Sequence, residues 1–320
     1  MSKIFFKEPS NYPRNQIVAE MLEGIDMGPY RILQPFNKKL FMRNREMRNF
    51  IINDFWISEY DTWVIDRRQE KWFYPKVLTH RRRDSVNLRC SKYLLADTQA
   101  HLDYWQEMYG RTKAKTFILP ALANRKKYVP SSEAEKKNEK FTVIYFGEFI
   151  PLHGLEIIME AMHEMEKEKK FPVLFQFFGK GQLSERFRKT LMSSSISFFN
   201  DKMIPEEELI PHIQRADVVL GIFGSSRKAR SVVPNKLYQG LACRKCVITM
   251  DSLAVREFFT QDEVKMIPRD AASLKKAIEE LFLHPERRNE FAAKGFAAFN
   301  RLYDSKRVAF REFISGIVNK

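Results

Sequence analysis

The sequence predicts an α/β fold divided between two Rossmann-like domains. A chain of 320 residues with 44% apolar residues is too long for one ordinary core and apolar enough for two. In its second half, short β-rich runs alternate with segments of helical periodicity, which is typical of a parallel sheet covered by helices on both faces. Glycines follow several of these runs, at the sheet edge where such folds bind their ligands.

The second half contains the clearer elements. Apolar runs that end in glycine or polar residues predict strands at Phe141–Phe146, Val173–Phe178, Ile196–Phe199, Asp217–Phe223 and Cys246–Met250. Between them we expect a helix from Gly154, where apolar residues recur at helical spacing, and a helix that opens at Pro205 with three glutamates. Further helices are expected from about Pro234, Ala271, Pro285 and Asp304.

The first half is less regular, and its predicted elements are shorter. Helices are expected at about Arg14–Glu23 and Gln99–Tyr109. The aromatic and basic stretch Phe36–Tyr60 has weak periodicity and predicts no element. Strands are expected at Lys3–Phe6, Tyr30–Leu33, Thr62–Ile65, Tyr93–Ala96 and Lys115–Leu119.

A polar segment at residues 131–140 follows Pro130 and is interpreted as an interdomain linker. We therefore expect an N-terminal domain over residues 1–130 and a C-terminal domain over residues 141–303. The last segment, residues 304–320, is expected to form a helix that returns to the N-terminal domain.

The chain is strongly basic, with 55 Lys and Arg against 40 Asp and Glu and a net charge of +15. Such an excess favours anionic partners: nucleic acid, acidic lipid head groups or phosphorylated ligands. A solvated basic face explains the same charge without a partner. The clusters lie mostly in the first half, for example at Arg43–Arg45, Arg67–Arg68 and Arg81–Arg83.

Cysteine usage and hydropathy indicate a cytoplasmic protein. Three cysteines imply no disulfide framework and favour a reducing compartment. The N-terminal apolar stretch is too short for a signal peptide, and no run reaches the ~18–20 apolar residues that span a bilayer. Cys243 and Cys246 have C-x-x-C spacing but no second Cys or His pair, so we interpret them as buried small residues.

Several segments occur together in an informative order. They are Ala96–His101 and Lys115–Pro120 in the first half, and then Tyr145–Glu156, Phe178–Gly181, Arg215–Val218, Val233–Ala242 and Val247–Thr249. In this order they resemble the retaining GT-B glycosyltransferases of the glycosyl transferases group 1 type. The resemblance covers about residues 90–300 and is densest over residues 141–250. It implies a GT-B architecture, two Rossmann-like domains facing each other across a cleft, with a C-terminal domain that binds a nucleotide-sugar.

The residues at the predicted strand ends suit a diphosphate. A pyrophosphate needs cations and exposed backbone N–H groups, and glycines at 147 and 154 let the backbone approach it closely. Lys236 stands at a predicted helix N-terminus, and Lys228 and Arg230 add charge nearby. The plain alternative for Lys236 is a solvated lysine in the first turn.

The resemblance assigns roles to particular residues. Lys236 would contact the distal phosphate and the segment Asn200–Ile204 would hold the base, largely through backbone atoms. Catalytic roles are expected for Lys236 and His153, and for His80 on the acceptor side. The expected donor-binding residues are Gly147, Glu148, Gly154, Gly179, Gly181, Lys202, Ile204, Lys228, Arg230, Pro234, Asn235 and Gln239.

The chain departs from the family pattern at four positions. Glu148 and His153 stand where the family usually has an Arg and a Lys. Ser231 and Gln239 stand where it has two glutamates. Gln239 can still bond a ribose hydroxyl, whereas Ser231 supplies no negative field near the sugar. These losses leave a catalytically degenerate scaffold open as an alternative.

The expected function is therefore transfer of a sugar from a nucleotide-sugar to a glycan or lipid-linked acceptor, with retention, in polysaccharide or glycoconjugate synthesis. No metal and no cofactor besides the nucleotide-sugar are expected. An anionic membrane surface at the inner face of the membrane is a further expected partner. A nucleic-acid-binding protein is a third hypothesis that rests on the charge and on the aromatic residues Trp56, Trp63, Trp72 and Tyr74, and it ranks below the other two.

Overall fold

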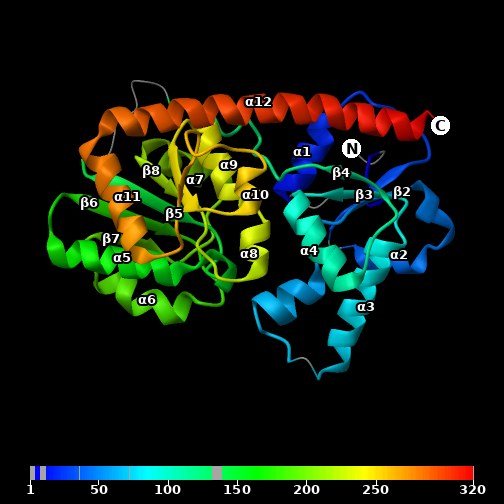
Figure 1. The fold of residues 1–320 in the computed structure, drawn as a ribbon, viewed down its shortest axis with the longest axis horizontal. Helices are drawn as coiled ribbons and strands as arrows, with labels where there is room; N and C mark the ends of the chain where they lie inside the picture. The colour runs from blue at the N-terminus through cyan, green and yellow to red at the C-terminus, as the bar shows by residue number, and fades with distance from the viewer. Residues whose placement is uncertain (1–3, 8–11, 36, 72, 132–138, 320) are drawn as a thin grey trace. The chain divides into compact units, whose positions relative to one another are not determined.

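The computed structural model describes residues 4–7, 12–35, 37–71, 73–131 and 139–319. The chain divides into two compact units, each with its own parallel sheet (Figure 1). Unit 1 comprises Met1–Leu122, Ser231–Val233 and Tyr303–Lys320, and unit 2 comprises Ala123–Arg230 and Pro234–Leu302.

Unit 1 is built on four parallel strands in the order β1-β2-β3-β4, and its short strands are buried except at the β4 edge. Its strands are β1 (Arg31–Leu33), β2 (Ile51–Asp54), β3 (Tyr93–Ala96) and β4 (Lys115–Ile118). Its helices are α1 (Pro13–Met21), α2 (Lys38–Arg43), α3 (Pro75–Arg89) and α4 (Gln99–Tyr109), with short helical turns η1 (Glu46–Phe50) and η2 (Asp61–Asp66).

One strand predicted for unit 1 is wrong. Residues 62–65 lie within η2, a π-helical turn, although Trp63-Val64-Ile65 has a β-rich composition. Polar contacts at Asp61 explain the difference, because its backbone N–H donates to Ser58 Oγ and its carboxylate accepts from Tyr104 Oη at 2.9 Å. These buried bonds fix the start of a turn that composition alone does not show.

For some parts of unit 1 the sequence predicted no element, and one predicted strand falls partly outside the described residues. α2, η1 and β2 all lie in the stretch for which the sequence predicted no element, and α3 was also not predicted. The expected strand at residues 3–6 falls partly outside the described residues; within them, Phe5 forms a single parallel bridge with Ile32.

Two buried ion pairs stabilise the polar interior of unit 1. Arg14 donates to both carboxylate oxygens of Asp54, and its remaining terminal nitrogen donates to the backbone oxygen of Leu119. Lys38 Nζ lies 2.5 Å from Asp84, which also accepts from a serine hydroxyl and a backbone N–H. Such pairs are tolerated inside a protein because every charge has hydrogen-bond partners.

Unit 2 is built on six parallel strands in the order β10-β9-β8-β5-β6-β7. The strands are β5 (Phe141–Phe146), β6 (Val173–Phe178), β7 (Ser197–Asn200), β8 (Val218–Leu220), β9 (Cys246–Met250) and β10 (Lys265–Ile267). Its helices are α5 (Leu155–Glu168), α6 (Ser184–Ser193), α7 (Glu206–Arg215), α8 (Arg227–Ser231), α9 (Asn235–Ala242), α10 (Leu253–Arg256), α11 (Ala271–Leu283) and the first part of α12 (Pro285–Val318), with the turn η3 (Pro151–His153).

The strand order of unit 2 reverses beside β5. The chain proceeds from β5 through β6 to β7 on one side, and then continues with β8, β9 and β10 on the other. A reversal of this kind opens a crevice at the carboxyl ends of the two middle strands, here β5 and β8. β8 has three residues rather than the seven predicted, because Gly221 to Gly224 leave the strand and run along this edge.

The end of the chain packs within unit 1. Residues of α12 from Tyr303 onward are grouped with unit 1, and the ring of Phe117 lies 5.4 Å from Phe310 and 5.2 Å from Phe313. Arg311 donates to the backbone oxygens of Met21 and Glu23. The expected linker at residues 131–140 lies mostly outside the described residues. Among the described residues, no helix has both the length and the apolarity needed to cross a bilayer.

Candidate functional site

Glycine loops meet at the carboxyl edge of the unit 2 sheet. Gly147 follows β5 with φ +111° and Gly179 follows β6 with φ +138°, a region that side chains rarely adopt. A Cβ on Gly179 would lie 2.0 Å from the backbone oxygen of Gly147, and one on Gly181 would lie 2.7 Å from the backbone of Phe149. The two loops are therefore in backbone contact, which only glycine permits.

A second backbone contact joins the start of α5 to the loop after β8. Gly154 has φ +62°, and a Cβ there would lie 2.1 Å from the backbone oxygen of Phe223. A Cβ on Gly224 would lie 2.2 Å from the backbone oxygen of Leu152. The N-terminus of α5 thus lies at the carboxyl ends of β5 and β8, where helix amides favour anions.

Lys236, the second residue of α9, is the principal cation of this edge. Its side chain is 4% exposed, and its Nζ has no hydrogen-bond partner. The Nζ lies 3.8 Å from the centroid of the Tyr145 ring, and a Cβ on Gly147 would lie 3.7 Å from it. Burial lowers the pKa of Lys236 well below its ordinary value, and the nearby Glu148 carboxylate opposes this only in part.

His153 faces the same point from η3. Its Nδ1 lies 2.5 Å from the backbone oxygen of Glu148 and 2.7 Å from Tyr145 Oη. A carbonyl only accepts, so Nδ1 carries a hydrogen, and Tyr145 Oη donates to the same carbonyl at 2.8 Å. These bonds orient the imidazole, whose Cε1 would lie 4.0 Å from a Cβ on Gly147. Burial also raises the pKa of Tyr145 well above its ordinary value, so this hydroxyl remains a donor.

The remaining predicted site residues lie on elements around this edge. Pro234 is the N-cap of α9 and Asn235 its first residue, beside Lys236. Lys202 and Ile204 follow β7, next to the Gly179 loop, since Gly179 N donates to the backbone oxygen of Asn200 at 3.1 Å. Within α8, Lys228 is buried, whereas Arg230 is exposed, as is Glu148 after β5.

Gln239 is engaged by a neighbouring side chain. Its Nε2 donates to Tyr128 Oη at 2.6 Å, and that hydroxyl donates to Glu206 at 3.1 Å. Lys127 also binds Glu206, at 2.8 Å. The amide nitrogen carries a second hydrogen, so both it and the carbonyl oxygen could still bond a ribose hydroxyl, and the Glu206 carboxylate lies one side chain away.

His80 lies on α3 in unit 1, whereas the residues described above belong to unit 2. Its Nδ1 lies 2.7 Å from Glu59 and its Nε2 lies 3.4 Å from Glu70. Arg83 shares Glu59 with it. This local network holds the imidazole between two carboxylates. Ser231 also belongs to unit 1, and its backbone oxygen accepts from Thr98 Oγ1.

Two site residues were missed from the sequence. Tyr145 was expected in a buried strand and at the start of the resembling segment Tyr145–Glu156, without a role of its own, yet it contacts both Lys236 and His153. Arg269 follows β10, a strand the sequence did not predict, and its Nε donates to the backbone oxygen of Phe223 at 2.7 Å. It thereby supports the backbone contact at Gly154. For Tyr145, the only signal in the sequence was its position one residue before the end of the predicted strand. No sequence signal pointed to Arg269.

Other chemistries find little support in the structure. Burial raises the pKa of Cys243 and of Cys246 to about 12, so both thiols are inert at neutral pH. Within the described ranges, no group of three or more His, Cys, Asp or Glu side chains is placed to hold a metal ion. The stacking candidates Trp56 and Trp63 are half-buried, Tyr74 is exposed, and Trp72 lies outside the described residues.

Comparison with known proteins gives a consistent result. Residues 140–284 match the family described as Glycosyl transferases group 1. A search of curated protein sequences found no match. Among solved structures, sucrose-phosphate synthase from Thermosynechococcus elongatus is similar with a TM-score of 0.72 and 13% identity, over 95% of this chain and 78% of that one.

Two further structures show the same likeness. HepE from Anabaena, solved in complex with UDP-glucose, has a TM-score of 0.68 and 12% identity over 97% of this chain and 84% of that chain. A glycosyltransferase from Rickettsia africae has a TM-score of 0.63 and 12% identity over 98% and 84%. These likenesses confirm the predicted α/β, GT-B fold class. The family match falls on the unit that carries the glycine loops and Lys236, so this unit is similar to the Glycosyl transferases group 1 family and the chain has the GT-B fold.

Proposed function

We propose that the chain transfers a sugar from a nucleoside diphosphate sugar to a hydroxyl of a glycan or lipid-linked acceptor, with retention of configuration. The observation that carries the proposal is the buried, unpartnered Nζ of Lys236 beside Gly147. A buried ammonium without an anion is costly, so a fold that keeps one is suited to receive an anionic ligand.

Lys236, the two glycines and His153 would each contribute differently to binding the diphosphate. Lys236 would neutralise the diphosphate, and Gly147 and Gly154 would let backbone amides approach it. His153 is oriented toward Gly147 by the Glu148 carbonyl, and in its imidazolium form its Nε2 would add a second donor to the same place. As the glycosidic bond breaks, negative charge grows on the leaving diphosphate, and a preorganised cation stabilises that charge more than the ground state.

Retention follows from the family resemblance rather than from a carboxylate nucleophile in this chain. The two positions at which the family carries glutamates hold Ser231 and Gln239. In such enzymes the leaving phosphate assists attack from its own face, so the cation that holds this phosphate is the critical group. Uridine diphosphate sugars are the first donors to test, because the similar HepE structure holds UDP-glucose.

The proposed wider setting is based on the charge of the chain. The basic first half suits a lipid-linked or phosphorylated acceptor, as in polysaccharide or glycoconjugate synthesis at the cytoplasmic face of a membrane. A degenerate scaffold is the second candidate. It is favoured by Ser231 and by the engagement of the Gln239 amide with Tyr128.

Calorimetric titration with UDP, GDP, TDP, CMP, ADP and UDP-glucose tests the proposal. We expect one nucleotide series to bind the wild type, and Lys236→Met to weaken that binding by at least about tenfold, the effect of losing one charge-assisted bond. Lys189→Ala is the matched control, because Lys189 is an exposed lysine of unit 2 on α6.

The outcomes separate the candidates. Binding by none of the nucleotides would refute sugar transfer from such donors. Equal binding by wild type and Lys236→Met would place the phosphates elsewhere. Tight binding without hydrolysis or transfer of the donor, in the presence of candidate acceptors, would favour the scaffold.

A further inference from the structure

Among the described residues, four of the thirteen large apolar side chains that are exposed lie around the start of α3. Leu78 is 68% exposed and Phe73 is 58% exposed, and Ile65 and Tyr74 are also exposed. These four belong to one stretch of unit 1, residues 65–78, whereas the other large exposed apolar residues are scattered along the described chain. A gathered set of this kind marks an interaction surface more often than single exposed residues do.

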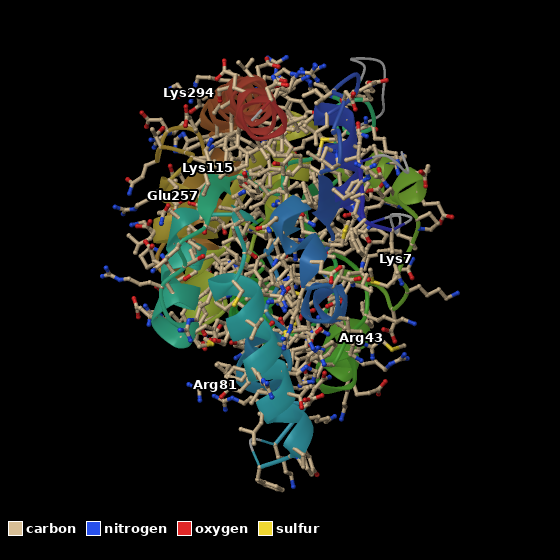
Figure 2. The ribbon with its side chains drawn as sticks, turned by 90° about the vertical axis from the view of Figure 1, so that its right-hand side faces the viewer. Lys7, Arg43, Arg81, Lys115, Glu257 and Lys294 are labelled. Carbon is tan, nitrogen blue, oxygen red and sulfur yellow. The ribbon has the colours of Figure 1, made fainter. Side chains whose placement is uncertain are left out.

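Cations surround these apolar side chains. Arg68, Lys71, Arg81 and Arg82 are exposed, and no described carboxylate forms an ion pair with any of the four. Leu78 and Arg82 are four residues apart on α3, so they point from the same face of the helix. In Figure 2 the side chain at the labelled Arg81 points away from the ribbon of α3.

The carboxylate side chains of this region are buried or half-buried. Glu59 is half-buried and binds His80 and Arg83, and Glu70 is half-buried and binds Lys76 at 2.8 Å. Asp66 is buried. The exposed face of the described residues 65–71 and 73–82, which we name the α3 tip, is therefore apolar and positively charged. Within unit 1, the α3 tip extends away from the four-stranded sheet (Figure 1).

We propose that the α3 tip docks on an anionic lipid bilayer, with Phe73 and Leu78 entering the interface between head groups and acyl chains. Cations beside exposed aromatic and aliphatic side chains are the combination that such interfaces select. An RNA or DNA partner would use the cations but gains nothing from an exposed leucine. The inference rests on the proposed function only in supposing an acceptor at a membrane; the docking itself does not depend on catalysis.

Vesicle flotation tests the docking with the full chain. We use phosphatidylcholine vesicles with and without about 30% phosphatidylglycerol, at low and high salt. The wild type should bind the anionic vesicles and be released by salt. Arg81→Ala with Arg82→Ala should weaken the partition coefficient about thirty-fold, from about 1 kcal/mol for each cation near an anionic surface. Phe73→Ser with Leu78→Ser should weaken it at least about tenfold.

Matched control variants remove the same number of cations, or of exposed apolar side chains, from unit 2 instead of the α3 tip. Arg186→Ala with Lys189→Ala removes two exposed cations from α6, and Met192→Ser with Leu283→Ser removes two exposed apolar side chains from unit 2. Both double variants should bind vesicles like the wild type. Equal losses in the control variants would overturn the assignment, because net charge or general hydrophobicity would then explain the binding.

Two further results would overturn the proposal. If Arg81→Ala with Arg82→Ala loses binding but Phe73→Ser with Leu78→Ser does not, the tip binds a polyanion and enters no bilayer. A single-stranded RNA that binds more tightly than the vesicles, and does so independently of Leu78, leads to the same conclusion. Calorimetric UDP binding should be unchanged in all tip variants, so a failure to dock leaves the proposed transfer unaffected, and a failure of UDP binding leaves the docking result intact.

Discussion

At the scale of single residues, the site depends on an ionisable side chain whose burial is energetically unfavourable. Lys236 is buried on the face of the Tyr145 ring, without a hydrogen-bond partner for its Nζ. Its burial lowers stability in the absence of ligand and raises the affinity for an anion, because the ligand supplies the missing partner. The same contact that makes the site useful thus makes the empty protein less stable.

We predict that Lys236→Met stabilises the empty protein at neutral pH. Methionine fills a similar volume and carries no charge to bury, so the melting temperature should rise by about 2–4 °C for each kcal/mol gained. The pKa of Lys236 is lowered in the folded state, so the unfolded chain binds more protons between that lowered pKa and about 10.4, and wild-type stability rises with pH there. The advantage of the variant should therefore shrink as pH rises through that window.

Scanning calorimetry of both proteins across that range is the measurement. A variant that melts below the wild type at neutral pH would show that Lys236 is paired in solution. Lys189→Ala, which removes an exposed lysine, should show neither the gain nor the pH dependence.

Nucleotide binding should take up protons at Lys236. The diphosphate raises the pKa of Lys236 again, so at a pH between the lowered pKa of the empty protein and the ordinary lysine pKa, binding draws a proton from the buffer. Titration calorimetry in two buffers of different ionisation enthalpy measures this uptake. Lys236→Met should show none; an equal uptake in the variant would assign it to another group.

Tyr145 is expected to act as a positioning residue. Tyr145→Phe keeps the ring under Lys236 but loses the hydroxyl bonds to His153 and Glu148, so nucleotide affinity should fall only a few-fold, or about 1 kcal/mol. Tyr145→Leu loses the ring as well and should cost a further several-fold. The KM for donor and the pH profile, compared at equal folded fraction, distinguish this role from a purely structural one, which would lower the amount of folded enzyme and leave both unchanged.

At the scale of elements, the site is assembled by backbone contacts between loops. Gly147 and Gly179 bring the β5 and β6 loops together, and Gly154 brings the start of α5 against the loop after β8. Arg269 holds that last contact from a third loop. The order of strands places all of these loops at one edge, so the site is a property of the sheet topology as much as of its side chains.

We predict that neither Ala nor Asn is accepted at position 154. A residue with φ +62° costs about 1–2 kcal/mol when alanine replaces glycine, and asparagine recovers part of it. At position 154 the Cβ would also lie 2.1 Å from the Phe223 oxygen, so the backbone must move and asparagine brings no rescue. Thermal unfolding and UDP titration of Gly154→Ala and Gly154→Asn measure the loss.

Gly24 provides the control for that prediction. It has φ +78° with nothing within 4 Å of a Cβ, so Gly24→Ala should show the conformational cost alone and Gly24→Asn should reduce it. If the two variants at position 154 behave like those at position 24, the contact with Phe223 is not a constraint in solution.

At the scale of the whole chain, sequence order and unit membership differ. Unit 1 contains the first 122 residues and also the last 18, whose buried Phe310, Ile314 and Ile317 complete its core. All predicted donor-binding residues lie in unit 2, whereas the α3 tip and His80 lie in unit 1. We therefore expect that the stability of unit 1 and the donor binding proposed for unit 2 can be altered separately.

Truncation after Leu302 tests this division. Removal of the last segment of α12 should expose Phe117 and lower the melting temperature of unit 1, while UDP binding to unit 2 is retained. Phe310→Ala should give the same effect to a smaller degree, a cost of about 3–5 kcal/mol for a buried phenylalanine. Val308→Ala, at an exposed position of the same helix, is the control. An unchanged melting curve after truncation would contradict the assignment of these residues to unit 1.

Sequence reasoning was most successful where local signals were strong. β5, β6 and β9 have the predicted bounds, because continuous apolar runs that end in glycine or polar residues favour buried parallel strands. It failed at residues 62–65, where buried polar contacts of Asp61 override a β-rich composition, and at α3, whose exposed apolar and basic residues carry no amphipathic pattern. The placement of Lys236 beside Gly147 was expected from the family resemblance, whereas the roles of Tyr145 and Arg269 were not.

The sequence alone determined that the chain alternates strands and helices, that glycines end its strands and that its charge is strongly positive. These are local or additive properties, which periodicity, composition and counting reveal. The tertiary structure decided which lysine is buried without a hydrogen-bond partner and which loops are in backbone contact. It also decided which arginines and lysines are exposed while neighbouring carboxylates are buried. Those outcomes depend on contacts between residues far apart in the chain, and such contacts leave no trace in a local pattern.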